Sequence, residues 1–204
     1  MQRIALIDYG AGNLTSVRKG FGTVGAGLFT PSHPSELVEA RAIVVPGVGN
    51  FRATAALDGQ WRAAIAEAMA RGTPLLGICL GLQWLFESSD EAPDVPGLGT
   101  LAGRCALLRT DTDSRLKVPH VGWNSLTTRR QSRLMEGVPD GAQVYFTHSF
   151  AAPVTDACVA STTHGVEFAA VVESKNVFGV QFHPEKSSEA GLRILRNFVG
   201  VTSA

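Results

Sequence analysis

The first 88 residues alternate between short apolar runs and longer segments in which apolar residues recur every three or four positions. The apolar runs, typical of buried strands, lie at 3–8, 26–30, 42–46 and 75–79. The segments with helical spacing lie at 14–24, 34–40 and 51–71, and the last has a break near Asp58-Gly59. This alternation predicts a parallel sheet with helices on both faces.

Three loops of this half follow predicted strands and are rich in glycine. They lie at 9–14, 46–51 and 77–81. Because ligands of open parallel sheets bind outside the carboxyl ends of the strands, we expect these three loops to meet at one site.

The pattern changes after residue 88. A loop is predicted at 88–97 from its serine, proline and acidic residues, and a final helix at 188–199 from the spacing of Leu192, Leu195 and Val199. Between them, β-rich runs lie at 104–109, 118–126, 142–150, 157–163, 166–173 and 177–182. We therefore expect an α/β fold in which a mostly parallel central sheet is flanked by helices, with additional β-structure packed beside it. We take residues 1–204 as a single domain.

Charge and hydropathy exclude several classes of partner. Lys and Arg total 18, as do Asp and Glu, so no net charge attracts nucleic acid or an anionic membrane. The apolar run after Met1 is too short for a signal peptide, and no stretch approaches the roughly 18 apolar residues of a membrane span. We expect a cytoplasmic protein that binds neither nucleic acid nor membrane.

The sequence Gly77-Ile78-Cys79-Leu80-Gly81 joins an apolar run to an amphipathic segment. We interpret it as a strand, a sharp turn that carries Cys79, and a helix. Such a turn strains its central residue and leaves no room for side chains two positions away, so it needs both glycines. The helix N-terminus behind Cys79 favours a thiolate, which is the placement of a nucleophile.

The other cysteines support a plainer interpretation. A lone cysteine in an apolar run is more often a small buried residue, and we expect this of Cys105 and Cys158. The three cysteines form no CxxC or Cys/His cluster, which argues against disulfides and a structural zinc site. We expect neither a metal nor a cofactor.

A cysteine nucleophile needs a base, a group that orients the base, and donors for an oxyanion. His183 follows a predicted strand, and residues two apart in an extended segment point the same way, so Glu185 can reach its ring. The backbone N–H of Leu80 is one candidate oxyanion donor. The other is the N–H of Val48, between two glycines that let its peptide rotate.

Residues 77–81, together with Gly179-Val180-Gln181-Phe182-His183-Pro184-Glu185, resemble the class I (triad) glutamine amidotransferases. Within that family, four further segments are similar to the glutaminase subunits of imidazole glycerol phosphate synthases: 8–14, 46–51, 119–124 and 145–149. The resemblance runs from about residue 3 to 199 and implies a flavodoxin-like sheet.

The resemblance implies that glutamine is hydrolysed through a thioester and that its ammonia passes to a cyclase subunit with a (β/α)8 barrel. The products would be imidazole glycerol phosphate and aminoimidazole carboxamide ribonucleotide, in histidine biosynthesis. Carried over by position, the triad is Cys79, His183 and Glu185, with oxyanion donors at Val48 and Leu80. The positions that hold glutamine are Gly49, Gln83, Glu91, His148 and Ser149, and those that face the cyclase are Asn13, Trp123, Tyr145 and Lys186.

Two other hypotheses remain open. The chain could be another triad amidotransferase, serving anthranilate, guanylate or pyridoxal phosphate synthesis, or a related cysteine hydrolase. It could also be a scaffold subunit that has lost activity, although the intact triad residues speak against this. The identity of the synthase that stimulates glutamine hydrolysis would test the first alternative. Ammonia production by a Cys79→Ala variant together with the partner would test the second. The resemblance also implies that the Val48 peptide reorients when the partner binds.

Overall fold

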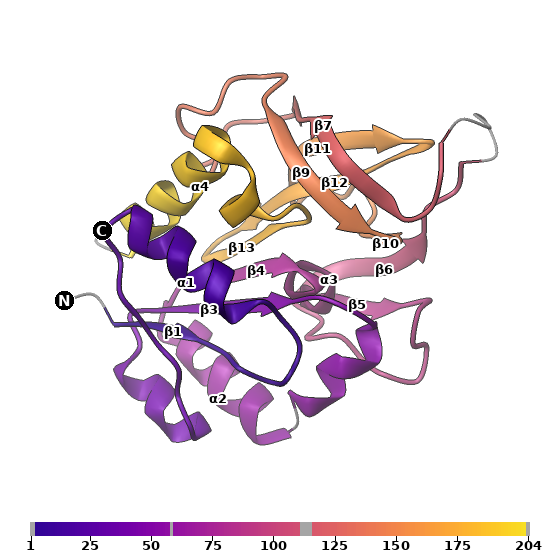
Figure 1. Ribbon diagram of the computed structural model, residues 1–204. Coiled ribbons are helices and arrows are strands. Elements are labelled where there is room, and N and C mark those ends of the chain that lie inside the picture. The colour runs from indigo at the N-terminus through magenta and orange to yellow at the C-terminus, as the bar shows by residue number, and fades with distance from the viewer. Residues whose placement is uncertain (1–2, 58, 111–115, 203–204) are drawn as a thin grey trace.

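A twisted sheet with helices on both faces forms the centre of the computed structural model (Figure 1). The structure describes residues 3–57, 59–110 and 116–202, and within these the central sheet has eight strands. In spatial order they are β2 (Leu28–Phe29), β1 (Ile4–Leu6), β3 (Ala42–Gly47), β4 (Leu75–Cys79), β13 (Val177–Val180), β12 (Val166–Ser174), β11 (Cys158–His164) and β8 (Thr127–Thr128). The first five are parallel, and the last three continue the sheet antiparallel. The predicted fold class is confirmed.

Helices cover the two faces because successive residues of the parallel strands point in opposite directions. Ile4 and Leu6 belong to the core under one face, whereas Ala5 and Ile7 belong to the core under the other. The helices are α1 (Leu14–Thr23) and α4 (Ser188–Val201) on the first face, and α2 (Gly59–Ala70) and α3 (Leu80–Leu85) on the second. Short 3₁₀ turns are η1 (Pro34–Glu39), η2 (Phe51–Ala56) and η3 (Pro184–Lys186).

The predicted helical segment 51–71 is divided. It consists of η2 and α2, so the break near Gly59 is present, while Asp58 itself lies outside the described residues. The segment 34–40 forms a 3₁₀ turn, whose first turn is capped by His33 and Glu36.

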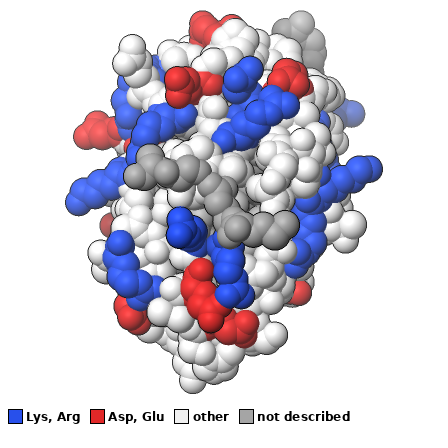
Figure 2. Space-filling model, turned by 90° about the vertical axis from the view of Figure 1, so that its left-hand side faces the viewer, with Lys and Arg blue, Asp and Glu red and all other residues white. Residues whose placement is uncertain are grey.

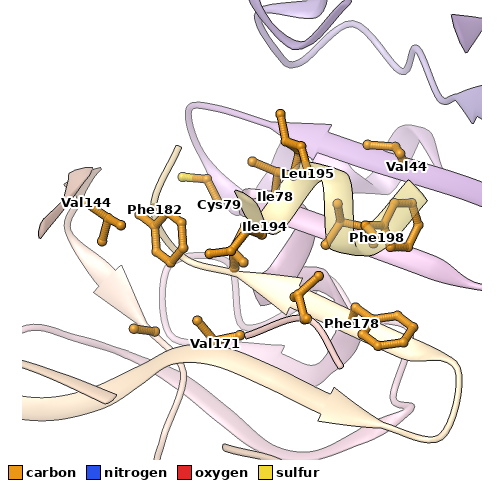
Figure 3. Close-up of a cluster of buried hydrophobic side chains, with 14 of the residues drawn as sticks. Val44, Ile78, Cys79, Val144, Val171, Phe178, Phe182, Ile194, Leu195 and Phe198 are labelled. Atoms are coloured by element: carbon orange, nitrogen blue, oxygen red, sulfur yellow. The ribbon is translucent and has the colours of Figure 1, made fainter. Parts of the chain in front are cut away.

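Cys79 lies at the boundary of the core beneath α1 and α4. Figure 3 shows it beside Ile78 and toward the Phe182 end of this cluster, with Phe178 and Phe198 at the opposite end. Cys79 is therefore supported by buried hydrophobic side chains of this core.

The C-terminal half differs from the prediction of a separate sheet beside the first. Several of its strands extend the central sheet, and only two small sheets stand apart from it among the described residues. One contains β10 (Phe150–Ala151), β6 (Leu101–Leu107) and β5 (Phe86–Ser89), and the other pairs β7 (His120–Ser125) with β9 (Gln143–His148). The loop predicted to begin at residue 88 begins at residue 90 instead, because Ser88 and Ser89 pair with β6.

Basic and acidic side chains are interspersed on the side of the molecule where β3 and β4 begin, as Figure 2 shows. This agrees with equal totals of basic and acidic residues. None of the helices among the described residues has the length and apolar content that crossing a bilayer requires.

Candidate active site

Cys79 occupies a strained turn between β4 and α3. Its φ is 55° and its ψ is −108°, a conformation that residues with a side chain rarely adopt. A Cβ on Gly77 would lie 2.5 Å from the carbonyl oxygen of Gly81, and one on Gly81 would overlap the carbonyl oxygen of Val45. The turn therefore has the form predicted from the two glycines.

His183 reaches this thiol because β13 lies beside β4. Val180 pairs with Ile78, and His183, three residues further on, lies close enough to Cys79 for the two side chains to interact. The backbone N–H of His183 donates to the carbonyl of Tyr145 at 2.9 Å, which holds the main chain at this position. Glu185 Oε1 lies 2.9 Å from His183 Nδ1, and both side chains are buried. His183 Nε2 is buried and has no hydrogen-bond partner among the described residues.

The charge state of His183 follows from its neighbours. Burial alone would lower its pKa, but the Cys79 thiolate and the Glu185 carboxylate outweigh burial and raise the pKa to about 9. The surroundings of His183 therefore favour its imidazolium form.

A cavity of about 280 Å³ opens at Cys79. This is close to the lower limit of roughly 300 Å³ for small-molecule sites, which suits an amino acid. Its wall contains every residue predicted to hold glutamine, together with Cys79, Leu80, Pro119, Thr147 and Phe150. One of them has a second contact: Glu91 Oε2 accepts the backbone N–H of Phe51 at 2.7 Å and so ties the loop after β3 to this wall.

The three loops predicted to meet do meet. A Cβ on Gly12 would lie 3.6 Å from Pro46, and Gly47 is the register partner of Cys79. Val48 follows directly and is 39% exposed, and it is the next residue, Gly49, that lines the cavity. The Tyr9 hydroxyl is buried against Gly47 and has no hydrogen-bond partner among the described residues.

The residues predicted to face a partner lie on one side of this site, apart from Asn13. Trp123 is 52% exposed, and its ring meets Tyr145 edge-on at 6.1 Å between centroids. Lys186 Nζ lies 5.8 Å from the centroid of the Tyr145 ring. Asn13 is exposed and caps α1 by accepting the N–H of Ser16.

Sequence reasoning missed one buried polar residue beside Cys79. Gln181 is fully buried, and its Nε2 lies 3.7 Å from Cys79 Sγ. It precedes His183 by two residues in an extended segment, so the spacing that identified Glu185 on one side could have identified Gln181 on the other. Cys105 and Cys158 are buried free thiols outside the cavity, as predicted.

A family model described as "Glutamine amidotransferase class-I" matches residues 5–201. The chain belongs to this amidotransferase family. The resemblance to the class I glutamine amidotransferases is thereby confirmed.

Two relatives of this chain carry the same name. This amidotransferase is 47% identical to "Imidazole glycerol phosphate synthase subunit HisH" of Natronomonas pharaonis, over 96% of this chain and 93% of the relative. It is also 47% identical to the protein of that name from Methanothermobacter thermautotrophicus, over 98% and 100%. The solved structure of PurLQS from Thermotoga maritima shares the fold, with a TM-score of 0.72 at 22% identity over 98% of this chain and 99% of that one.

The raised pKa of His183 predicts how the stability of this amidotransferase depends on pH. A folded pKa of about 9 lies above the ordinary 6.5, so the stabilisation is fully present below pH 6.5 and is lost as the pH rises through about 9. We expect the free energy of unfolding, measured by urea denaturation, to fall over this window. In Glu185→Gln, which lacks the carboxylate, the fall should be smaller, and an equal fall in both proteins would show that another group causes it.

Proposed function

We propose that this protein is the glutaminase subunit of an imidazole glycerol phosphate synthase and that it hydrolyses glutamine through a thioester on Cys79. The observation that carries the proposal is the series of contacts from Glu185 through His183 to Cys79, which lines an amino-acid-sized cavity. The relatives named HisH support the assignment to this synthase.

The first half-reaction uses the buried triad. His183 Nε2 holds the proton of Cys79, and the thiolate attacks the side-chain amide carbon of glutamine. His183 then gives its proton to the leaving nitrogen, the carbon–nitrogen bond breaks, and ammonia departs from the thioester. Glu185 orients the ring through Nδ1 and stabilises its positive charge, as the 2.9 Å contact supports.

The second half-reaction returns the enzyme to its starting state. His183 removes a proton from water, whose oxygen attacks the thioester carbon. The carbon–sulfur bond then breaks, glutamate leaves, and His183 again holds a proton beside the thiolate. Both tetrahedral intermediates carry an oxyanion that needs N–H donors. Leu80 begins α3, where the first backbone N–H groups have no partner within the helix, and Val48 follows the register partner of Cys79.

Glutamine is held through its charged α-groups and its amide. Glu91 is the acidic residue of the cavity wall, and we assign it to the α-ammonium group. Gly49 and Ser149 lie on the same wall, beside the space for the substrate. The Gln83 and His148 side chains are already hydrogen-bonded to the carbonyl of Phe150, so they shape the wall around the substrate.

Replacement of Glu91 by Gln tests this assignment. Gln can still accept the N–H of Phe51, so only the charge is lost. We expect the KM for glutamine to rise roughly 30-fold, the equivalent of about 2 kcal/mol for a charged hydrogen bond, with little change in kcat. Asp94→Asn is the control, because Asp94 pairs with exposed Arg52 outside the cavity. Equal KM values for the two variants would rule out an ammonium contact at Glu91.

The partner is the cyclase subunit. Ammonia released into water at neutral pH is mostly protonated and no longer nucleophilic, so the glutaminase must dock over its acceptor. The exposed Trp123, the adjoining Tyr145 and Lys186 form an aromatic and cationic group beside the site, which is the composition of an interface centre. We assign the docking of a (β/α)8 barrel to this side, with Asn13 at its margin.

The decisive experiment measures glutamine hydrolysis by this protein alone, with a barrel cyclase, and with the cyclase and its nucleotide ligand. We expect ammonia and glutamate to form fastest in the third mixture. If the cyclase leaves the rate unchanged while an anthranilate or guanylate synthase partner raises it, the assignment to histidine biosynthesis is wrong.

A further inference from the structure

Two buried histidines lie opposite each other in the β7–β9 pair. His120 is the register partner of His148, and His120 Nδ1 lies 3.2 Å from His148 Nε2. Beyond them, Asn124 Nδ2 lies 3.3 Å from His120 Nε2, and His148 Nδ1 lies 2.9 Å from the carbonyl oxygen of Phe150. A line of contacts thus runs from Asn124 through His120 and His148 to the carbonyl of Phe150, a residue of the cavity wall.

The partners at the two ends fix the direction of every hydrogen bond. The Phe150 carbonyl can only accept, so His148 donates through Nδ1, and its Nε2 must accept in the neutral ring. His120 therefore donates through Nδ1 and accepts through Nε2 from the Asn124 amide. Burial lowers the pKa of His120 to about 3 and that of His148 to about 4, so both rings are neutral at physiological pH.

The line continues to the nucleophile from the other side of Phe150. Gln83 Nε2 donates to the same carbonyl at 2.8 Å and to Gln181 Oε1 at 3.2 Å. Gln181 Nε2 then lies 3.7 Å from Cys79 Sγ. A carbonyl oxygen has two lone pairs, so Phe150 can accept from His148 and Gln83 together.

We propose that His120 and Asn124 are positioning residues of the glutaminase site: they fix the tautomer and ring plane of His148, and through it the wall formed by residues 147–150. This inference rests on the proposed glutaminase function. Neither residue lines the cavity, and both act through His148 and the carbonyl of Phe150.

The wall needs this support because its position sets two contacts. The carbonyl of Thr147 lies 4.0 Å from Cys79 Sγ, and Ser149 lines the cavity. Loss of the donor from His120 leaves a buried ring nitrogen of His148 unpaired, which favours a rotated or protonated ring. Either change would displace residues 147–150 relative to the bound substrate.

Packing alone is the competing explanation for any effect at His120. Its ring is stacked between Phe146, at 4.8 Å, and His164, at 4.1 Å. His120→Phe keeps this stack and removes both hydrogen bonds, whereas His120→Asn can keep a donor near the position of Nδ1. His164→Phe is the matched control, because it changes the same stack but leaves the line from Asn124 to Phe150 intact.

The kinetic test measures KM and kcat for glutamine in the complex with the synthase partner. For His120→Phe we expect KM to rise about tenfold with kcat nearly unchanged, and for His120→Asn we expect most of this increase to disappear. His164→Phe should stay within about twofold of the unchanged protein. Equal effects of His120→Phe and His164→Phe, or no rescue by His120→Asn, would overturn the proposal.

The second test requires neither a variant nor a measurement of catalytic activity. Nitrogen-15 NMR of the histidine rings in the full-length chain should show a proton on Nδ1 and none on Nε2 in both His120 and His148 at neutral pH. A proton on Nε2 of either ring would refute the line of donors. This result does not depend on activity, so the two proposals are tested separately. The tautomers could contradict the positioning role in a protein that hydrolyses glutamine. Equally, both tautomers could be as assigned in a protein that does not hydrolyse glutamine.

Discussion

Replacement of Cys79 by Ala should abolish glutamine hydrolysis, with a loss in kcat of at least about 10⁴-fold. The reason is that the thioester cannot form, while His183 and Glu185 alone offer no comparable nucleophile. The measurement is the formation of glutamate and ammonia by the complex with the synthase partner. The same complex should keep its synthase activity when an ammonium salt replaces glutamine, because that reaction does not use the thiol.

Cys158→Ala is the matched control for this prediction. Cys158 is also buried, but its Sγ donates to the carbonyl of Ala160 in β11, outside the cavity. We expect its glutaminase activity to stay within about twofold of the unchanged protein. If Cys79→Ala still produced ammonia at the normal rate, the chain would have only a scaffold role, and the hypothesis of an inactive relative would return.

The parallel part of the fold could be predicted because its signals are local. β1, β3 and β4 are predominantly apolar runs in which every residue is buried, and such runs mark strands buried on both faces. The sheet to which the C-terminal strands belong could not be predicted in the same way. Whether β11 and β12 form their own sheet or extend the first depends on pairing between β12 and β13, and no local pattern specifies that choice.

The arrangement of Cys79, His183 and Glu185 could be predicted for a related reason. Gly77 and Gly81 mark the turn at Cys79 by their spacing alone, and Glu185 lies two residues from His183. The spatial approach of Cys79 to His183 spans more than a hundred residues and was inferred only from the joint presence of both motifs.

The supporting contacts could not be predicted in the same way. The bond from Phe51 to Glu91 joins residues forty positions apart, and the line from His120 to Phe150 requires the exact register of β7 against β9. In sequence, His120 is only one histidine among five. Residues that act by positioning other residues cannot be recognised in the sequence until the pairing of distant strands is known.

Gly81→Ala should be the most damaging single-methyl change in the turn. The added Cβ would overlap the backbone carbonyl of Val45, and a strand carbonyl in the centre of the sheet cannot move aside as a flexible side chain could. The α3 helix would have to withdraw from β3, and Leu80 and Cys79 would move with it. We expect the free energy of unfolding to fall by about 4 kcal/mol or more, with loss of glutaminase activity in whatever protein still folds.

Gly22→Ala provides the comparison, because this glycine lies in α1 with open space where the Cβ would be. Ala restricts the unfolded chain and favours the helix, so we expect this variant to be more stable by up to about 1 kcal/mol. Chemical denaturation of both variants separates the close approach at the turn from the general effect of replacing glycine. If Gly81→Ala unfolded at the same denaturant concentration as the unchanged protein, β3 and α3 could not be in the contact that places Cys79 at the cavity. The strain at the nucleophile would then need another source.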